Sequence, residues 1–372
     1  KICVGINHFA PLLMTTIAVI GTRGFPGIQG GVEKHSENLY PRMNGDVRLR
    51  VYRRKPYLSA LSHHNYDHIE FVDLPSTRIK GFEAVFHTFL CVMHILFHRP
   101  DFVHIHNIGP GMFAPILHLA GIKTVMTYHS PNYEHKKWGA VARQILRLSE
   151  TLSLKFVDRV IFVNRFQMEK YSQKITKKSI YIPNGIVRTE PSTSTSFLEK
   201  IGVVPNSYVL AVGRLTPEKG FEYLVQAANS LPEVKHLVIA GASDHDESYL
   251  NTLKSLDTNH KVIFTGFTFG EDLRQLYSHA KLFVLSSTHE GFPLVLLEAM
   301  NYRLPIVASD IPATHLIQLN EKDYAKSADP ESLAKCISCH LQCNTPRKDY
   351  DIKKYDWDTI AATTLDVFHS IK

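Results

Sequence analysis

Short apolar runs alternate with amphipathic stretches along almost the whole chain, and this alternation limits the fold more than any other feature. Each apolar run has the length of a buried strand, and each amphipathic stretch suits a helix that crosses to the next strand. The predicted strands are residues 15–20, 48–52, 69–74, 102–106, 123–128, 159–163 and 180–182, and then 208–212, 236–240, 261–265, 282–286 and 305–309. The pattern predicts an α/β protein with two doubly wound parallel sheets in tandem.

A chain of 372 residues exceeds what one hydrophobic core usually organises, so two domains are expected. We place the first at residues 14–190 and the second at 191–354, because the Ser/Thr-rich stretch 191–196 has no apolar periodicity and is typical of a linker. Residues 355–372 contain an amphipathic segment that we expect to pack back across the hinge as a helix. Residues 1–13 precede the first strand, and we interpret them as an extension foreign to the fold.

Basic residues gather in the first half of the chain. Residues 1–185 carry 24 Lys and Arg against 12 Asp and Glu, whereas the remainder carries 18 against 23, so balances of +12 and −5 make the net charge of +7. We expect the first domain to meet an anionic partner, either a membrane surface or a lipid-linked phosphate. A nucleic acid partner is not expected, because the sequence lacks zinc-finger spacing, an RNA-recognition signature and a basic stripe interleaved with aromatics.

The longest apolar run, residues 84–97, is shorter than the roughly 18 residues of a membrane span and contains His87 and His94. We interpret it as a buried helix or as a face apposed to a membrane. Five cysteines are too few and too unevenly spaced for a disulfide scaffold, which indicates a reducing compartment. We therefore expect a cytoplasmic protein, peripheral at the inner face of the membrane.

One group of residues has the composition of a metal site. Cys336, Cys339 and Cys343, with His340, fall on one face of a predicted helix. Apolar residues lie close by on the same helix, so buried thiols that act as small hydrophobes explain this group better than metal ligands do.

A glycine-rich segment, residues 21–31, follows the first predicted strand and precedes a helix. Glycines there permit positive φ and let backbone amides approach a phosphate, so the segment also fits a dinucleotide-binding turn. The acid that usually ends the second strand of such a fold is missing, and Arg53 and Arg54 stand in its place. Because arginines suit the 2′-phosphate of NADP, an NADP-dependent oxidoreductase is an alternative.

A second turn of this kind, residues 212–220, joins a strand to a helix in the second half. Arg214 and Lys219 project from it at the edge where parallel strands end. Together they would place roughly two positive charges beside a leaving diphosphate. For either residue alone, a surface charge beside a turn is a reasonable interpretation, but the position at the carboxyl end of a strand weakens it.

Two carboxylates, Glu290 and Glu298, flank a Gly-Phe-Pro turn. Glu290 falls in the loop at the carboxyl end of a strand and Glu298 more than one turn into the next helix, so both can face one crevice. Helix N-terminal amides there favour a phosphate, and the carboxylates suit sugar and ribose hydroxyls. An isolated pair of this kind is more often a turn residue and a solvated helix residue.

Four motifs in this order resemble those of retaining glycosyltransferases of family 4: Gly30-Gly31, Pro183-Asn184-Gly185, Gly213-Arg214 with Lys219-Gly220, and the span from Glu290 to Glu298. The resemblance covers residues 15–372, and residues 20–24 with 30–33 are similar to a subgroup that includes bacterial rhamnosyltransferases and other surface-polysaccharide enzymes. It implies the GT-B fold, two Rossmann-like domains facing a deep cleft. It also implies transfer of a hexosyl, deoxyhexosyl or N-acetylhexosaminyl group from a nucleotide-diphosphate donor to a glycan or lipid-linked acceptor.

The resemblance assigns roles to the residues of the second domain. Arg214 and Lys219 would neutralise the diphosphate of the donor. Glu298 would hold the ribose hydroxyls, and Glu290 the hydroxyls of the transferred sugar. The remaining donor contacts would be the backbone amides of Gly291, Phe292 and Leu294.

In the first domain, Gly30 and Gly31 would approach the phosphates as the cleft closes. His129 ends a predicted strand and resembles the active-site histidine of the family, near the transferred sugar. His104 and His106, also at a strand end, are second choices, because a histidine there is often simply hydrogen-bonded.

Enzymes of this family keep the anomeric configuration, and the mechanism usually proposed is a front-face attack in which the donor phosphate helps to take the acceptor proton. No protein nucleophile is therefore expected. Asp244 and Asp246 have metal-motif spacing, but they flank His245 in a polar loop after a strand and are interpreted as solvated, so we expect no metal and no cofactor. A non-catalytic GT-B module that binds a nucleotide or glycan is a second alternative.

Overall fold

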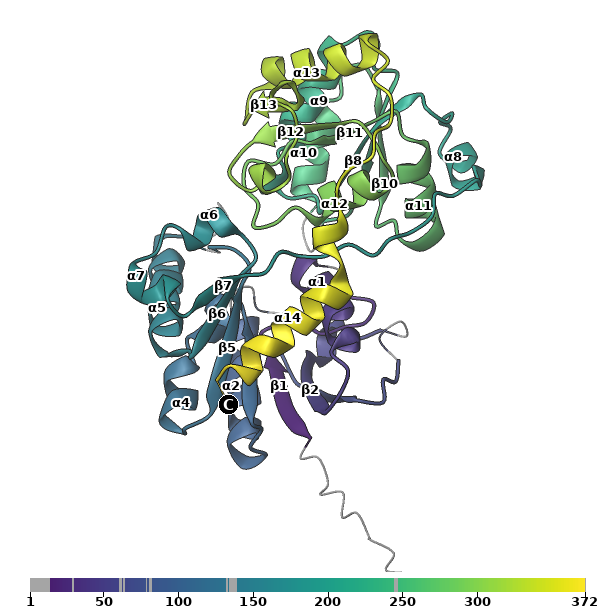
Figure 1. Ribbon diagram of the computed structural model, residues 1–372. Coiled ribbons are helices and arrows are strands. Elements are labelled where there is room, and N and C mark those ends of the chain that lie inside the picture. The colour runs from purple at the N-terminus through teal and green to yellow at the C-terminus, as the bar shows by residue number, and fades with distance from the viewer. Residues whose placement is uncertain are drawn as a thin grey trace, which may run out of the picture.

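The computed structural model describes residues 14–371, except 29, 60–61, 63, 78, 80–81, 132, 134–138 and 244–246. The extension at 1–13 and the pair Asp244 and Asp246 therefore lie outside the described residues. The described chain forms two α/β domains, each built on a parallel sheet (Figure 1). This confirms the predicted fold class.

The first domain has a seven-stranded sheet of order β3-β2-β1-β4-β5-β6-β7. Its strands are β1 (Thr15–Ile20), β2 (Val47–Arg54), β3 (Ile69–Leu74), β4 (Phe102–His106), β5 (Lys123–Tyr128), β6 (Arg159–Phe162) and β7 (Ser179–Tyr181). Because β1 pairs with β2 on one side and with β4 on the other, the strand order reverses at β1. Ligands of doubly wound folds bind beyond the strand ends at such a reversal.

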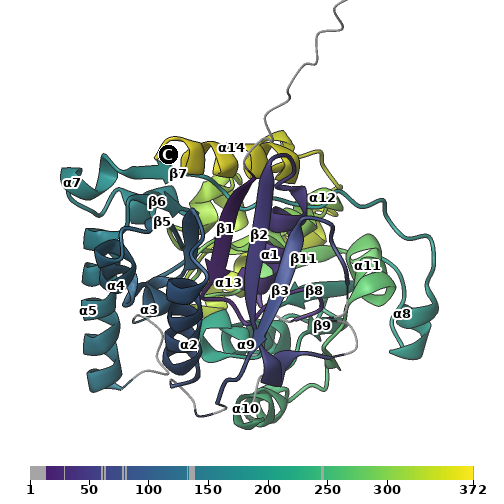
Figure 2. The same ribbon diagram turned by 90° about the horizontal axis from the view of Figure 1, so that it is seen from below.

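Helices cover both faces of this sheet. The helices of the first domain are α1 (Gly31–Leu39), α2 (Glu83–Phe97), α3 (Ile108–Gly111), α4 (Ala114–Leu119), α5 (Ala140–Phe156), α6 (Arg165–Met168) and α7 (Gln173–Thr176). Ile17 and Val19 of β1 pack with α1 on one face, and Ala18 and Ile20 pack with α2, α3, α4 and α5 on the other. Figure 2 shows these last four helices side by side. The two-residue period of a strand thus divides β1 between two cores.

The second domain has a six-stranded sheet of order β10-β9-β8-β11-β12-β13. Its strands are β8 (Tyr208–Val212), β9 (His236–Ala240), β10 (Val262–Gly266), β11 (Leu282–Leu285), β12 (Ile306–Asp310) and β13 (Tyr324–Lys326). Its helices are α8 (Ser196–Lys200), α9 (Phe221–Ser230), α10 (Ser248–Leu256), α11 (Gly270–His279), α12 (Leu294–Asn301) and α13 (Pro330–Gln342). Every predicted strand of the chain is present to within two residues at each end, whereas β13 was not predicted.

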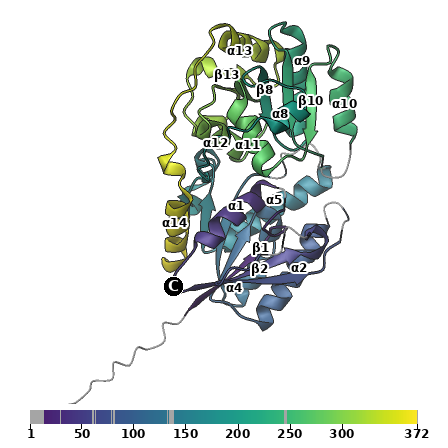
Figure 3. The same cartoon turned by 90° about the vertical axis from the view of Figure 1, so that its right-hand side faces the viewer.

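The end of the chain returns to the first domain. Helix α14 (Trp357–His369) runs along the side of the molecule (Figure 3), and Ile360 and Phe368 lie in the core beneath it. Trp357 lies against Gly185, where an added Cβ would collide with the indole ring.

In the expected linker, Ser192 is buried and its amide donates to Ser278 Oγ over 2.7 Å. The residue limits given above for the domains stay a prediction.

The interpretation of the cysteines on α13 is wrong for two of them. Cys339 and Cys343 are exposed, and Cys336 is half-buried. The face of α13 toward the core carries Leu333, Ile337 and His340 instead. These three follow the spacing of one helical stripe, and the cysteines occupy the neighbouring stripe.

Among the described residues, no helix combines the length and apolar character needed to cross a bilayer. Helix α2, the longest apolar run, has 15 residues and a buried side formed by His87, Cys91, Val92 and Ile95.

Candidate active site

A cleft of about 660 Å³ lies between the two domains, lined by loops that follow the strands of both sheets. Apart from the second choices His104 and His106, the residues predicted from the sequence to form the site line this cleft: Gly30, Gly31, His129, Arg214, Lys219, Glu290, Gly291, Phe292, Leu294 and Glu298. A smaller adjoining pocket of about 170 Å³ shares His129, Glu290 and Gly291 with it. The structure thus brings the predicted residues together, and their chemical roles remain predictions.

Two positions of the cleft favour glycine, Gly30 through its backbone conformation and Gly291 through a close approach to the other domain. Gly30 precedes α1 with a φ of 150°, and an added Cβ would collide with the carboxylate of Glu33. Gly291 lies against the backbone carbonyl of His129 in the other domain, and an added Cβ would overlap it. Asn164 Nδ2 also donates to Gly291 O over 2.9 Å. At Gly31 an added Cβ would meet nothing within 4 Å, so the space there is open to a ligand.

Two charged side chains of the second domain form an ion pair in the wall of the cleft. Lys219, at the end of the short 3-10 helix Pro217–Lys219, places Nζ 2.6 Å from Glu290 Oε1. The hydroxyl of Ser287 donates to the same oxygen over 2.7 Å. The Lys219 and Glu290 side chains are only 17% and 10% exposed, so each charge depends on the other. The sequence placed both residues in the site but did not predict this pairing.

Glu298 lies on α12 at the cleft, where Tyr277 of α11 donates its hydroxyl to Oε2 over 2.7 Å. Burial raises the pKa of the Glu298 carboxyl, while the Tyr277 hydrogen bond and the positive charge of Lys34 oppose the rise. Lys34 belongs to α1, so the first domain contributes a cation opposite this carboxylate. Lys34 is a cleft residue that the sequence analysis missed.

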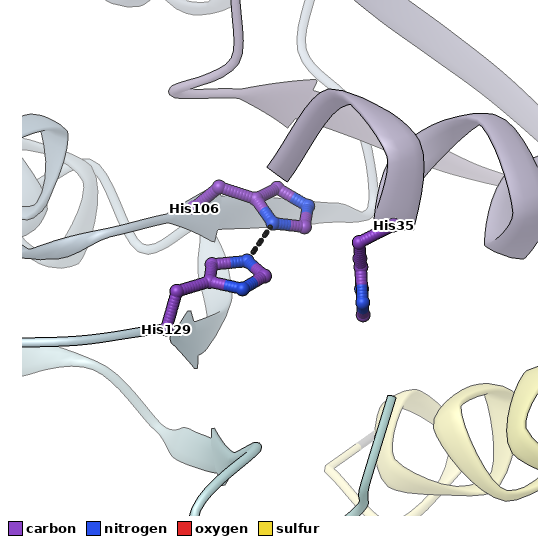
Figure 4. Close-up of side chains that lie close together, drawn as sticks. All are labelled: His35, His106 and His129. Carbon is purple, nitrogen blue, oxygen red and sulfur yellow. Dashed lines mark hydrogen bonds between the residues drawn. The ribbon is translucent and has the colours of Figure 1, made fainter. Parts of the chain in front are cut away.

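The wall formed by the first domain contains a chain of hydrogen-bonded rings. His129 Nε2 lies 2.9 Å from His106 Nδ1 (Figure 4), and His106 Nε2 lies 2.5 Å from the hydroxyl of Tyr40. The same hydroxyl lies 2.8 Å from His104 Nδ1, and His104 Nε2 lies 2.7 Å from Thr127 Oγ1. The second choices His104 and His106 are thus fully buried behind His129 instead of lining the cleft.

The histidines of this wall are uncharged at neutral pH. Burial lowers the pKa of His35 to about 4, partly opposed by its hydrogen bond to Asn184. Burial, with the nearby His35, lowers the pKa of His104 to about 3. Burial and the neighbouring histidines hold the pKa values of His106 and His129 well below the usual 6.5. Each ring therefore has one N–H donor and one acceptor nitrogen.

A chain of neutral rings links the tautomers of its members. If His129 donates from Nε2, His106 donates to Tyr40 and Tyr40 donates to His104; if the chain runs the other way, every donor becomes an acceptor. The protonation of His129 Nδ1, its other ring nitrogen, therefore follows from the direction of the chain. The hydroxyl of Tyr40 joins His104 to His106 and so couples their tautomers. Nothing in the sequence indicated this role.

Three nitrogens of this wall could hold a metal ion by their spacing. The side chains of His35, His106 and His129 offer nitrogens within 4.8 Å of one another, and they form the one group of this kind in the described part of the chain (Figure 4). No carboxylate belongs to the group, and two of the nitrogens are already joined by the 2.9 Å hydrogen bond. His35 Nε2 has no hydrogen-bond partner among the described residues. The expectation of a metal-independent site stays a prediction.

The motif Pro183-Asn184-Gly185 supports this wall. Asn184 Oδ1 lies 2.7 Å from His35 Nδ1, and the ring of Trp357 lies edge-on to His35 with centroids 5.4 Å apart. His35 and Asn184 are 149 residues apart in the chain, so sequence spacing could not have joined them.

The arginines that suggested NADP are engaged elsewhere. Arg53 makes two hydrogen bonds to Asp73, of 2.7 and 2.9 Å, and a third to the carbonyl of Ser62. Arg54 pairs with Glu83 over 3.4 Å, and both arginines are buried. Neither lines the cleft. The structure therefore removes the support for a 2′-phosphate site at the end of β2.

Each domain matches a different family model. Residues 29–190 match the model described as Glycosyltransferase Family 4, and residues 198–357 match the one described as Glycosyl transferases group 1. The two models together cover most of the chain, in the order that the sequence motifs predict.

Curated relatives match part of the chain. An uncharacterized glycosyltransferase of Methanocaldococcus jannaschii is 35% identical over 210 residues, which are 51% of this chain and 53% of that protein. The UDP-Gal:alpha-D-GlcNAc-diphosphoundecaprenol alpha-1,3-galactosyltransferase of Escherichia coli is 26% identical over 239 residues, 60% of this chain and 61% of that protein. The alignments thus span only about half to three fifths of these relatives.

Solved structures match nearly the whole fold. Sucrose-phosphate synthase from Thermosynechococcus elongatus has a TM-score of 0.80 and 21% identity, covering 96% of this chain and 99% of that one. Anabaena HepE in complex with UDP and glucose has a TM-score of 0.77 and 20% identity, covering 96% and 100%. These likenesses confirm the predicted GT-B fold.

Proposed function

The chain belongs to the glycosyltransferases of the group 1 and family 4 models, and on that premise we propose that it is a retaining enzyme of bacterial surface polysaccharide biosynthesis. It transfers a sugar from a nucleotide-diphosphate donor to a glycan carried on a membrane lipid. The observation that carries this proposal is the convergence of the residues from four sequence motifs on one cleft between the domains.

The donor binds mainly to the second domain. Arg214 and Lys219 face the diphosphate, and Glu298 accepts hydrogen bonds from the ribose hydroxyls. The Lys219–Glu290 pair gives Lys219 a fixed position, 2.6 Å from a carboxylate that also faces the sugar. In the bound donor, a phosphate oxygen accepts from the Lys219 ammonium, and a sugar hydroxyl donates to the Glu290 carboxylate.

The first domain supplies uncharged contacts to the transferred sugar. His129 is neutral, so it exchanges hydrogen bonds with a hydroxyl without adding charge to the cleft. In the front-face reaction, the acceptor oxygen forms the new bond to the anomeric carbon while the bond to the donor phosphate breaks. The acceptor proton passes to the departing phosphate oxygen, and Arg214 and Lys219 offset its charge.

Relatives support the donor and acceptor classes. The E. coli relative is named for UDP-galactose and a diphosphoundecaprenol acceptor, and the HepE structure holds UDP and glucose. The basic first half of the chain suits an anionic membrane that presents such an acceptor. We place the enzyme in the cytoplasm at the inner face of the membrane.

Ligand-induced stabilisation tests the donor class. Thermal unfolding is measured with UDP, GDP, dTDP and NADPH, since a ligand that binds only the folded protein raises its unfolding temperature. A rise with one nucleoside diphosphate and none with NADPH is expected. A rise with NADPH alone would establish the oxidoreductase alternative instead.

Turnover separates an enzyme from a non-catalytic GT-B module. Products from a panel of nucleotide sugars and lipid-linked acceptors are identified by mass spectrometry, for the wild type and for Glu290→Gln and Lys219→Ala. The proposal expects product from the wild type and at least about 100-fold less from either variant. A nucleotide that binds the wild type without any donor hydrolysis or transfer would favour the module.

A further inference from the structure

One cleft residue holds its backbone in a conformation that a side chain rarely allows. Asn107, directly after β4, has a φ of 68° and a ψ of 160°. Only glycine adopts that conformation routinely, because the Cβ of any other residue crowds the neighbouring backbone. Six described residues other than glycine have a positive φ, and five of them are exposed: Asn206, His260, Arg303, Ala328 and Asn344. Asn107 is the one of the six that lines the cleft.

The fold around Asn107 enforces this conformation. Its N–H donates to the carbonyl of Thr127 on β5 over 3.1 Å, and its own carbonyl accepts from the amide of Gly111 over 3.3 Å. The next residue, Ile108, is fully buried, and the hydroxyl of Ser149 on α5 donates to its carbonyl. The backbone is thus held on both sides of Asn107, which is the condition under which a strained residue persists.

Local structure does not explain why an asparagine stands at this position. Asparagine tolerates a positive φ mainly in the left-handed helical region, where ψ is about 30–60° and its amide bonds to nearby backbone. The ψ of 160° lies far from that region, and the Asn107 side chain makes no capping hydrogen bond to α3. Glycine would adopt the same backbone without strain. The carboxamide, half-buried at the cleft, is therefore what this position retains at a cost in stability.

The position of Asn107 indicates which substrate its side chain meets. Strand β4 lies between β1 and β5, and the second domain approaches the carbonyl of His129, after β5, through Gly291. Asn107 is therefore one strand farther from that contact. The groups proposed to hold the diphosphate and ribose of the donor belong to the second domain. The space at the end of β4 is thus left to the acceptor, which in a front-face reaction approaches the donor sugar from the first domain.

The side chains of this part of the cleft suit an uncharged sugar ring. A carboxamide has two N–H donors and an acceptor oxygen, so it can donate to one sugar hydroxyl and accept from another. Glu37 of α1, half-buried at the cleft, also accepts from hydroxyls and would repel a phosphate. A phosphate would need a cation, and Lys34, the one Lys or Arg that the described first domain brings to the cleft, lies opposite Glu298.

We propose that the carboxamide of Asn107 binds a hydroxyl of the acceptor sugar, and that the strained turn fixes the carboxamide for this contact. The inference rests on the proposed function and names a residue that recognises the acceptor. It separates two properties that usually change together. Removing the carboxamide should weaken transfer to the acceptor, whereas relieving the strain should stabilise the fold.

Two substitutions at Asn107 separate these properties. Asn107→Gly removes both the carboxamide and the strain, so its thermal midpoint should rise by about 2–4 °C. Asn107→Ala removes the carboxamide and keeps the strain, so its midpoint should stay at or below that of the wild type. Transfer is measured with farnesyl diphosphate-linked N-acetylglucosamine, glucose and galactose as acceptor probes. In both variants, kcat/KM for the probe that the wild type prefers should fall about tenfold, the equivalent of one hydrogen bond.

The donor reactions and a second asparagine are the controls. Hydrolysis of the donor by water and binding of the nucleoside diphosphate should stay within about twofold of the wild type in both variants. Asn206→Gly is the matched control, because Asn206 has a φ of 57° at an exposed site of the second domain. It should transfer to the probes like the wild type.

Deoxy versions of the preferred probe, each lacking one hydroxyl, identify the group that Asn107 binds. One of them should react about tenfold more slowly than the full probe with the wild type, and equally fast with Asn107→Gly, because the variant has already lost that contact.

An Asn107→Gly protein that transfers like the wild type, or that is no more stable, would overturn the inference. Activity that follows the thermal midpoint, lower in Asn107→Ala than in Asn107→Gly, would also overturn it and leave Asn107 a structural residue. So would a wild type that hydrolyses the donor and transfers to none of the probes. These outcomes leave the donor reactions of the proposed function intact. A wild type that neither binds a nucleoside diphosphate nor hydrolyses a donor removes the proposed function, and the inference with it.

Discussion

The two walls of the cleft differ in how they handle charge. The second domain presents Arg214, Lys219, Glu290 and Glu298, all ionisable groups at the cleft surface. The first domain presents His129, backed by buried histidines whose pKa values are lowered until they are neutral. Ligand charge is therefore matched mainly on the second-domain wall, while the first-domain wall offers hydrogen bonds without charge at His129 and one cation, Lys34, opposite Glu298.

This difference suits the two parts of a nucleotide sugar. A diphosphate needs cations that stay fixed as its negative charge grows, and an ion pair such as Lys219–Glu290 fixes one of them. A sugar hydroxyl needs a partner with a defined donor and acceptor, which a ring held in a hydrogen-bonded chain provides. Four changes, taken from the largest expected effect to the smallest, test this division between the walls.

Loss of the cation on the charged wall should have the largest effect. Lys219→Met removes the positive charge that faces the diphosphate and leaves the partly buried Glu290 without its cation, so kcat/KM for donor turnover is expected to fall about 100- to 1000-fold. Lys235→Met, at an exposed site of the same domain, is the control and should act like the wild type. Because the pair acts as a unit, Lys219→Met with Glu290→Gln should cost less than the two losses multiplied. Activity within about threefold of the wild type would contradict the assignment.

Acid should destabilise the protein, because folding keeps the buried histidine His35 of the first-domain wall uncharged. The pKa of His35 is about 4 in the folded state against 6.5 unfolded, so below about pH 6.5 the unfolded chain binds more protons and stability is lost as the pH falls toward 4. At pH 5 this one residue lowers the free energy of unfolding by about 2 kcal/mol. Denaturant unfolding at pH 7.5 and pH 5 measures it.

A variant isolates the contribution of His35. His35→Gln removes the titrating ring and should reduce the loss of stability between pH 7.5 and pH 5. His369→Gln, at the exposed end of α14, should keep the full loss. Equal pH dependence in the wild type and His35→Gln would show that a charged His35 is tolerated in the fold.

Tyr40 tests the coupling within the ring chain. Tyr40→Phe removes the hydroxyl between His104 and His106, so kcat is expected to fall about tenfold, the equivalent of one hydrogen bond, with little change in the KM for the donor. Tyr52→Phe is the control, because Tyr52 is also a buried tyrosine bonded to a histidine, His94, but it lies on the opposite face of the sheet. Nitrogen NMR of His129 should show a mixture of tautomers in Tyr40→Phe alone. An unchanged tautomer would mean that Tyr40 has only a structural role.

Metal removal should have the smallest effect. Because His106 and His129 are already hydrogen-bonded to each other, treatment with EDTA is expected to change the rate by less than about twofold. Activity that falls with EDTA, returns with Zn²⁺ and is absent in His35→Gln would instead identify the three histidines as a metal site.

The sequence predicted the fold well because hydrophobic periodicity is a local signal. Buried strands such as β4 and β5 were predicted to the residue, whereas β13, the three residues Tyr324–Lys326, is too short and too polar to form an apolar run. The cysteines of α13 were placed on the wrong stripe, since Leu333 and Ile337 already formed the core side of that helix.

The candidate site was predicted only where a motif lies in one stretch of chain. Glu290 and Glu298 come from one turn and one helix, and both line the cleft. The other contacts join residues that are far apart in the chain. Lys219 and Glu290 are 71 positions apart, His35 and Asn184 are 149 apart, and Tyr40 is more than 60 from the histidines that it joins. Such contacts depend on how two sheets and α14 pack, which periodicity in one sequence does not encode.

Calorimetric titration with the nucleoside diphosphate that stabilises the wild type tests the division between the walls most directly. This ligand lacks the sugar, so it should contact the charged wall and the backbone at Gly30 and Gly31, but not His129. Arg214→Gln and Glu298→Gln are expected to weaken binding about tenfold or more, while His129→Asn should change it by less than about twofold. Binding that weakens with His129→Asn and is unaffected by Arg214→Gln and Glu298→Gln would contradict the account.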